Sequence, residues 1–324
     1  MRAKLFTTIL AGLCALGFAL PAGAQAFPPA KPVTMVVGFA PGGAADAAAR
    51  LIAKKLSENI GQSVVVENKA GAGGNIAHQQ VAAGAADGSL ILLGSIGPLT
   101  IAPHMMKVGY DPFKDLAAIS GGVNFPNLLV VHPGTGIKNM ADFLALAQSK
   151  PNAVSYASTG NGSASHLAGE LFAARTGTEM LHVPYKGGAP AMNDLLGGRF
   201  TGYFSAPATS LPHVEAGKLI PLATTGLTRP AYMPNIPTVA ESGLPGFEAL
   251  NWYAFVASSK TPAPILDRWN QEIVKVLNDR EVREALTKHG LTAHPTTRAE
   301  LTDFMQKESA KWAHIVKERK ITPE

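Results

Sequence analysis

The chain has 324 residues, of which 46% are apolar and 16% are charged. An apolar share of this size can fill more than one hydrophobic core, and it excludes a chain that is mainly disordered. The formal charge of +5 falls to +3 when Arg2 and Lys4 of the N-terminal segment are subtracted, and the remaining charge is not clustered. Nucleic-acid binding, which needs a basic face, is therefore not expected.

The N-terminal segment has the three-part pattern of a secretory signal peptide. Arg2 and Lys4 precede an apolar run over residues 5–20, and the small residues after Pro21 offer cleavage after Ala24 or Ala26. The run is shorter than the roughly 20 residues that a membrane-spanning helix needs. We expect residues 1–26 to be removed on export. The only cysteine, Cys14, would leave with them, so no disulfide or thiol chemistry is expected.

The rest of the chain alternates strands and helices. The first part predicts strands at 34–39, 63–68 and 89–93 and helices at 45–60 and 76–85, with Asn75 as the N-cap of the second helix. Later elements are expected at 128–131, 140–148, 153–157, 167–172, 181–183, 192–196, 200–204 and 220–225, followed by helices around 265–277 and 301–315.

This order predicts an α/β fold with two lobes, each a mostly parallel sheet flanked by helices. We expect the helical tail to pack on the first lobe, so that the chain crosses between the lobes twice. Lobe 1 would comprise residues 27–126 and 250–324, and lobe 2 residues 127–249.

Three loops between a strand and a helix are rich in glycine, serine and asparagine. They lie at residues 41–43, 71–74 and 158–163. Such loops gather at one edge of a parallel sheet, where each presents backbone N–H groups and a helix N-terminus. A plain tight turn is the alternative for any one of them, but together they predict an anion site.

Several single polar residues could have either a structural or a ligand-binding role. Asp46 either stabilises its helix dipole or receives a ligand ammonium or a water, and its spacing from Arg50 favours an ion pair. His166 and His182 are candidate ligand contacts, although a structural hydrogen-bonding role is favoured for both. Trp252, Tyr253 and Trp269 are expected to pack in a core or a hinge.

Catalytic motifs are missing from the sequence. There is no G-x-S-x-G and no H-E-x-x-H, and the glycines at 71 and 73 are followed by Ile76 where a dinucleotide fingerprint has its third glycine. We therefore expect no enzyme activity, no cofactor and no metal.

Several blocks of the chain resemble one family. The motif P-G-G-x-x-D-x-x-x-R at 41–50 is similar to the signature of the solute receptors of tripartite tricarboxylate transporters, the Bug or TctC-like periplasmic proteins. Blocks at 66–76, 160–172, 182–188, 237–243 and 252–253 resemble further family blocks, in family order and over nearly the whole mature chain.

The resemblance implies a type II periplasmic-binding fold in which two lobes close on a small carboxylate. It implies a monomer in the periplasm that delivers its ligand to integral-membrane transporter subunits. Carried over by position, the ligand-binding residues of the first lobe would be Phe39, Gly43, Ala44, Ala45, Asp46, Ala72, Gly73 and Ser95. Those of the second lobe would be Ser158, Thr159, Asn161, Ser163, His166, Tyr185 and Ser205.

Two departures from the family pattern bear on the ligand. Many relatives carry a hydroxyl residue where this chain has Ala44 and Ala45, so recognition there would rest on main-chain N–H groups. Ser205 stands where relatives often have an acidic residue. We therefore expect a mono- or dicarboxylate without an amine, aromatic acids included. A receptor for a membrane signalling partner and an exported carboxylate-processing enzyme are the alternative functions.

Overall fold

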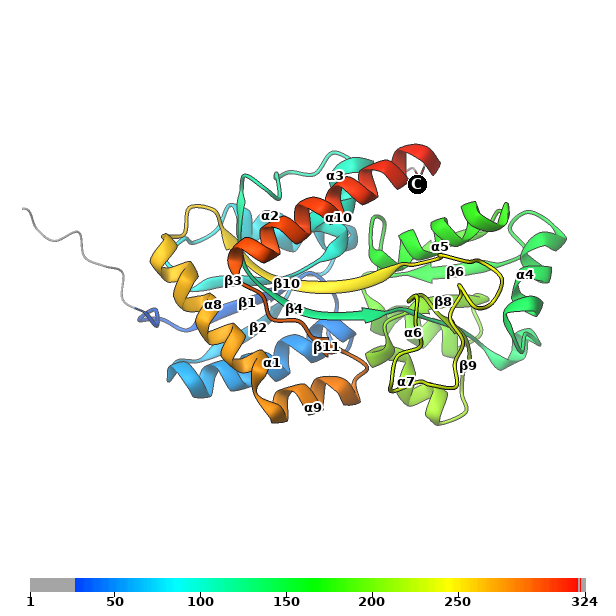
Figure 1. Ribbon diagram of the computed structural model, residues 1–324, viewed down its shortest axis with the longest axis horizontal. Coiled ribbons are helices and arrows are strands. Elements are labelled where there is room, and N and C mark those ends of the chain that lie inside the picture. The colour runs from blue at the N-terminus through cyan, green and yellow to red at the C-terminus, as the bar shows by residue number, and fades with distance from the viewer. Residues whose placement is uncertain (1–26, 320, 322–324) are drawn as a thin grey trace, which may run out of the picture.

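The structure is a computed structural model that describes residues 27–319 and 321, and these residues form two β-sheets that lie side by side (Figure 1). The expected signal peptide and Cys14 lie outside the described residues. Within the described part of the chain, no helix combines the length and apolar character that crossing a membrane requires.

The first sheet, sheet A, has six strands in the order β11-β4-β10-β3-β1-β2. Strand β1 runs parallel to β2 and β3, whereas β10 runs antiparallel to β3 and β4, and β11 antiparallel to β4. The strands are β1 (Val33–Val37), β2 (Val64–Asn68), β3 (Leu90–Ser95), β4 (Leu116–Pro126), β10 (Leu250–Ser258) and β11 (Thr292–Ala293).

The second sheet, sheet B, has five strands in the order β7-β6-β8-β5-β9. Strand β6 runs parallel to β7 and β8, and β5 runs antiparallel to β8 and β9. The strands are β5 (Leu128–Val131), β6 (Ser155–Ser158), β7 (Leu181–Pro184), β8 (Gly202–Ser205) and β9 (Ile220–Thr224).

Helices flank both sheets (Figure 1). They are α1 (Ala44–Ile60), α2 (Asn75–Ala82), α3 (Ala102–Met105), α4 (Met140–Ser149), α5 (Ala164–Thr176), α6 (Gly188–Leu196), α7 (Pro207–Glu215), α8 (Ala263–Asn278), α9 (Arg280–Lys288) and α10 (Arg298–Arg319). Shorter helical turns are η1 (Ala72–Gly74), η2 (Gly97–Ile101) and η3 (Pro133–Thr135).

The α/β fold is confirmed, but the expectation of mostly parallel sheets is wrong. The chain passes from sheet A to sheet B as β4 runs into β5, and it returns between β9 and β10. These crossing strands run antiparallel to their neighbours, so both sheets are mixed. The sequence does not indicate β4 and β10 as strands, because both are largely buried on two faces and show little alternation of apolar and polar residues.

The expected cap of the second helix is also wrong. Asn75 is the first residue of α2, and Gly74 holds the N-cap position. The Asn75 side chain instead donates to the carbonyl oxygen of Ala72 at 2.7 Å and accepts from the hydroxyl of Tyr110 at 2.8 Å. It therefore ties η1 to a distant loop, and no local pattern in the sequence indicates that.

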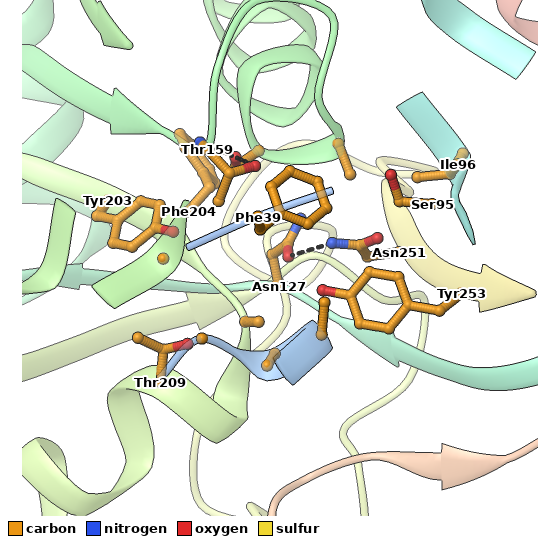
Figure 2. A pocket seen from close by; sticks show the side chains of 17 residues that line it. Phe39, Ser95, Ile96, Asn127, Thr159, Tyr203, Phe204, Thr209, Asn251 and Tyr253 are labelled. Atoms are coloured by element: carbon orange, nitrogen blue, oxygen red, sulfur yellow. Dashed lines mark hydrogen bonds between the residues drawn. The ribbon is translucent and has the colours of Figure 1, made fainter. Parts of the chain in front are cut away.

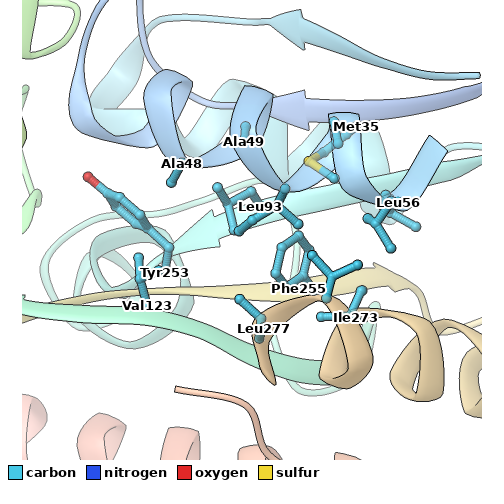
Figure 3. Close-up of a cluster of buried hydrophobic side chains, with 14 of the residues drawn as sticks. Met35, Ala48, Ala49, Leu56, Leu93, Val123, Tyr253, Phe255, Ile273 and Leu277 are labelled. Carbon is cyan, nitrogen blue, oxygen red and sulfur yellow. The ribbon is translucent and has the colours of Figure 1, made fainter. Parts of the chain in front are cut away.

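The main core covers one face of sheet A (Figure 3). Successive residues of a strand point to opposite faces, and Met35 accordingly packs with α1 and α8 while Val36 faces the helix layer of α2 and α10. Along α1, the buried residues Ala48, Ile52 and Leu56 recur at helical spacing. Small alanines on α1 let it approach the sheet closely, so the loop before α1 is held at a fixed place.

Candidate ligand-binding site

A hollow lies between the two sheets, at the point where the chain crosses from one to the other (Figure 2). It is narrow: the centres of water-sized spheres can occupy about 20 Å³ of it, although about 460 Å³ lies between its atoms when the open mouth is included. Residues of both sheets line it: Phe39, Gly43, Ala44, Ala45, Ser95, Ile96, Asn127, Asn251 and Tyr253 on or beside sheet A, and Thr159, Ala164, Ser165, Gly188, Tyr203, Phe204, Ala206 and Thr209 on or beside sheet B. The hollow is therefore a site that neither sheet could form alone.

Four helices begin at this hollow. Lining residues occupy the N-cap or the first turn of α1 (Gly43), α5 (Ala164), α6 (Gly188) and α7 (Ala206). The N–H groups of a first helical turn have no partner within the helix, and each helix N-terminus carries about half a positive charge. Four of them at one hollow make it a favourable place for an anion.

The side chains around the hollow are uncharged. Among the described residues that line it, none is acidic, basic or a histidine. Burial raises the pKa of Tyr203 and of Tyr253, so both phenols stay protonated and can donate a hydrogen bond. An anion held here would be neutralised by peptide and hydroxyl dipoles without a cationic side chain.

Four buried polar atoms of the lining have no hydrogen-bond partner among the residues that the structure describes. They are Ser95 Oγ, Asn127 Nδ2, Thr209 Oγ1 and Asn251 Oδ1. A buried polar atom left unpaired costs about 1–3 kcal/mol, which is why native proteins seldom contain several together. The cluster therefore indicates a polar guest.

Asp46 does not line this hollow. Its Oδ2 accepts from the Gly42 N–H and from Arg50 Nε, both at 3.0 Å, and its Oδ1 accepts from Asn68 Nδ2 at 3.0 Å and lies 2.9 Å from an Arg50 nitrogen. Burial raises the pKa of this carboxyl, but the hydrogen bonds from Arg50, Gly42 and Asn68 outweigh burial and lower it. The expected Asp46–Arg50 pair is confirmed, and it fixes the loop that opens α1.

The second glycine loop takes a different position from the first. Ala72 and Gly73 lie in a separate surface groove together with Asn161 and Tyr185 of the sheet B side. A Cβ on Gly160 would lie 2.9 Å from Gly73 Cα, so the two loops touch through their backbones. Gly73 also has φ of +62°, a conformation that glycine adopts easily. The loops at 71–74 and 158–163 therefore contact each other, and they do so outside the lining of the hollow.

The remaining candidates lie behind the lining. The ring of His166 stacks on that of His182 with centroids 4.1 Å apart, and His182 Nε2 lies 2.6 Å from Ser158 Oγ. Ser163 caps α5 by accepting from the N–H of His166. Buried Ser205 donates to the Ala206 carbonyl oxygen at 3.1 Å. Ser158 and His166 support the loop that carries Thr159, because they accept from the N–H groups of Gly160 and Gly162.

Of the candidates, the structure thus brings Phe39, Gly43, Ala44, Ala45, Ser95 and Thr159 together around the hollow. Sequence reasoning missed Asn127, Asn251 and Thr209, and it assigned Tyr253 to packing. No local pattern marked Asn127 and Asn251, because they stand beside or within apolar strands and meet only through the pairing of β4 with β10.

Comparison with known proteins places the chain among solute receptors. Residues 48–321 match the family model of the "Tripartite tricarboxylate transporter family receptor". The chain is 35% identical over 317 residues to the protein BugT of Bordetella pertussis, covering 97% of each chain. Its structure is similar to that of the periplasmic binding protein BugD, with a TM-score of 0.88, 33% identity and coverage of 91% of this chain and 100% of BugD.

A second solved structure is equally similar. It is that of Rpa4515 of R. palustris with adipate, with a TM-score of 0.88, 34% identity and coverage of 91% of this chain and 99% of Rpa4515. The match of the family model over most of the chain, together with these relatives, shows that the chain belongs to the tripartite tricarboxylate transporter family of receptors.

Proposed function

We propose that the protein is a periplasmic receptor that captures a small carboxylate in the hollow between its sheets and releases it unchanged. In this proposal residues 27–126 and 250–324 form one lobe and residues 127–249 the other, and the lobes close on the ligand. The membrane subunits of a tripartite tricarboxylate-type transporter would take up the ligand. An exported protein would begin with the signal peptide that residues 1–26 resemble.

The observation that carries this proposal is the convergence of four helix N-termini on one hollow whose described lining has no charged side chain. A charge-assisted hydrogen bond contributes about 1.5–3 kcal/mol. Several of them, less the cost of ordering the ligand, are compatible with a micromolar dissociation constant, which corresponds to about −8 kcal/mol. The adipate in the related Rpa4515 structure supports the carboxylate class.

The same lining argues against an amine on the ligand. An ammonium group buried here would need a carboxylate partner, and Asp46, the acidic residue in the first turn of α1, already accepts hydrogen bonds from Gly42, Arg50 and Asn68. We therefore propose a mono- or dicarboxylate, aromatic acids included, and not an amino acid.

Binding without turnover is supported by the chemistry around the hollow. In the described part of the chain, Ser158 and His182 resemble a nucleophile and its base, with Ser158 Oγ 2.6 Å from His182 Nε2. Neither residue lines the hollow, and both are buried behind it. A ligand in the hollow would contact backbone N–H groups, amides and hydroxyls, which bind and orient but do not transfer protons at neutral pH.

Calorimetric titration of the mature protein with succinate, adipate, benzoate, aspartate and glutamate tests the proposal. We expect micromolar binding of at least one acid without an amine, and mass spectrometry should return that acid intact. Binding of aspartate or glutamate alone would contradict the proposed ligand class, and conversion of a bound acid would favour an enzyme.

A pair of variants checks where the anion lies. Ala45→Asp and Ala45→Asn add side chains of nearly the same shape to the N-terminus of α1, and only the first adds a negative charge. We expect Ala45→Asp to bind the acid much more weakly than Ala45→Asn does, because the new carboxylate takes the anion's place at the helix dipole. Equal affinities of the two variants would place the acid elsewhere.

A further inference from the structure

Two asparagines form the floor of the hollow (Figure 2). Asn251 belongs to β10 and Asn127 directly follows β4, and Asn251 Nδ2 donates to Asn127 Oδ1 at 3.4 Å. Asn127 is fully buried and Asn251 is 8% exposed. Both residues stand where β4 ends and β10 begins, which is where the chain crosses between sheet A and sheet B.

The hydrogen bond between the two asparagines leaves one NH₂ group and one carbonyl oxygen of the pair without a partner. Asn127 Nδ2 is a donor without a partner, and Asn251 Oδ1 is an acceptor without a partner. If both amides were turned over, the bond would run the other way and the pair would still leave one NH₂ and one C=O group. The floor of the hollow therefore always offers a donor beside an acceptor.

The backbone holds this pair in place. The Asn127 N–H donates to Thr225 Oγ1 at 2.9 Å, and Thr225 Oγ1 donates to the Ala249 carbonyl oxygen at 2.7 Å. The Thr225 N–H also donates to the Asn127 carbonyl oxygen at 2.9 Å. One threonine thus ties together both segments that cross between the sheets, so the amides lie where a movement of the sheets displaces them least.

The rest of the hollow contributes donors. The helix N-termini offer N–H groups, and the hydroxyls of Ser95 and Thr209 can donate. A carboxylate satisfies donors but has no proton for Asn251 Oδ1. An ammonium group has protons, but no acidic residue among the described ones lines the hollow to balance its charge. The oxygen of one hydroxyl group can accept from Asn127 and donate to Asn251. A carboxamide needs two atoms for this, because it accepts through its oxygen and donates through its nitrogen.

We infer that the ligand is a hydroxycarboxylic acid, whose carboxylate lies at the helix N-termini and whose hydroxyl binds between Asn127 and Asn251. This inference rests on the proposed function and adds the chemical group that decides specificity. A parent acid without the hydroxyl would leave the acceptor buried and unpaired, which weakens binding by about tenfold or more.

Acids that differ only at C2 test the inference. Each set has a parent acid with H at C2, a hydroxy acid with OH and an amino acid with NH₃⁺. The first set is succinate, malate and aspartate, and the second is glutarate, 2-hydroxyglutarate and glutamate. The third set is propionate, lactate and alanine. Both enantiomers of each chiral acid are titrated into the mature protein by calorimetry. We expect one hydroxy acid to bind about tenfold or more tightly than its parent acid and its amino analogue.

Variants of the pair give a second readout. Asn251→Ala should remove the preference for the hydroxy acid over the parent. Asn251→Asp, which keeps the shape, supplies the missing negative charge and should move the preference toward the amino analogue. Thr261→Val is the matched control, because Thr261 Oγ1 is also buried without a partner but does not line the hollow; it should keep the wild-type preference. Thermal unfolding of each variant shows that it is folded.

The outcomes separate the inference from the proposed function. Equal binding of a parent acid and its hydroxy acid would overturn the inference and leave the carboxylate receptor standing. An unchanged preference in folded Asn251→Asp would also overturn it. If no acid of the three sets or of the first titration bound, the proposed function would fall, and the inference with it.

Discussion

A Cβ atom on Gly73 would collide with the carbonyl oxygen of Asn161, on the loop of the other sheet. The same relationship recurs where a Cβ on Gly97 would lie 2.5 Å from the Gly162 carbonyl oxygen. Nearby, the Ala40 N–H donates to the Lys186 carbonyl oxygen at 2.9 Å and so joins the loop before α1 to the loop before α6. The glycine-rich loops therefore allow the two halves of the molecule to meet backbone to backbone around the hollow.

Substitution of Gly73 should disrupt the backbone contact between its loop and the loop of Asn161. Gly73→Ala adds a methyl group that collides with Asn161, so we expect the two halves to separate and the radius of gyration in X-ray scattering to increase. Gly61→Ala is the matched control, because Gly61 has φ of +65° and no atom lies within 4 Å of the place that its new methyl group would take. Both variants bear the cost of an alanine with positive φ, about 1 kcal/mol. If they scattered alike, the contact would have no role in closure.

The hydrogen bonds that Asp46 accepts from Gly42, Arg50 and Asn68 should stabilise the loop before α1. Asp46→Asn replaces the charged carboxylate by a neutral amide, and we expect the free energy of unfolding in urea to fall by about 1–3 kcal/mol at pH 7. Because hydrogen bonding holds the pKa of Asp46 below 3.8, this contribution is complete above that pH and is lost as pH falls through the folded value.

A surface ion pair provides the comparison for Asp46. Asp303 forms an i,i+4 pair with Lys307, and both side chains are mostly exposed. Asp303→Asn should leave the free energy of unfolding nearly unchanged, since solvent screens such pairs. An equal loss of stability in the two variants would mean that the buried contacts of Asp46 stabilise the fold no more than an exposed ion pair does.

Three buried histidines should make the protein sensitive to acid. Burial lowers the pKa of His78 to about 4, of His166 to about 3 and of His182 to about 4. In the unfolded chain each takes up a proton near pH 6.5, so the folded state loses stability as pH falls from 6.5 toward 4, by about 1.4 kcal/mol per pH unit for each histidine.

Urea unfolding at pH 7 and pH 5 measures this loss. Replacing His182 with Gln should reduce the difference between the two pH values, although it also disturbs the contact with Ser158. Replacing the exposed His289 with Gln should leave the difference as it is in the wild type. A wild-type stability that did not change between the two pH values would show that these histidines are not held neutral.

Thr209 should separate binding from stability. Its buried hydroxyl has no partner, so Thr209→Val removes an unpaired polar atom without changing the shape, and we expect the melting temperature of the free protein to stay level or rise. Affinity for the acid should fall, because the hydroxyl would donate to it. Thr224→Val, which removes an unpaired hydroxyl away from the hollow, should leave affinity unchanged. Undiminished affinity in Thr209→Val would exclude that contact.

Local patterns predicted much of the fold. Helix α4 and strand β5 lie within a residue of their predicted bounds, because hydrophobic periodicity and helix-stop signals act over a few residues. The pairing of Asp46 with Arg50 follows from one turn of helix. The mixed sheets were not predictable in this way, since strand direction depends on where the chain crosses between the lobes.

The α/β class, the glycine loops, the family motif and the residues at the start of α1 are readable from short stretches of the chain, because each depends on neighbours within a few positions. Which of these residues line one hollow depends on how distant segments pack. Asn127 and Asn251 are 124 positions apart and meet because β4 and β10 pair side by side, while Ala72 and Gly73 lie outside the hollow because their loop contacts its counterpart across the sheets. Pairing over such separations is set by the burial of whole strands and helices, and no short stretch of sequence specifies it.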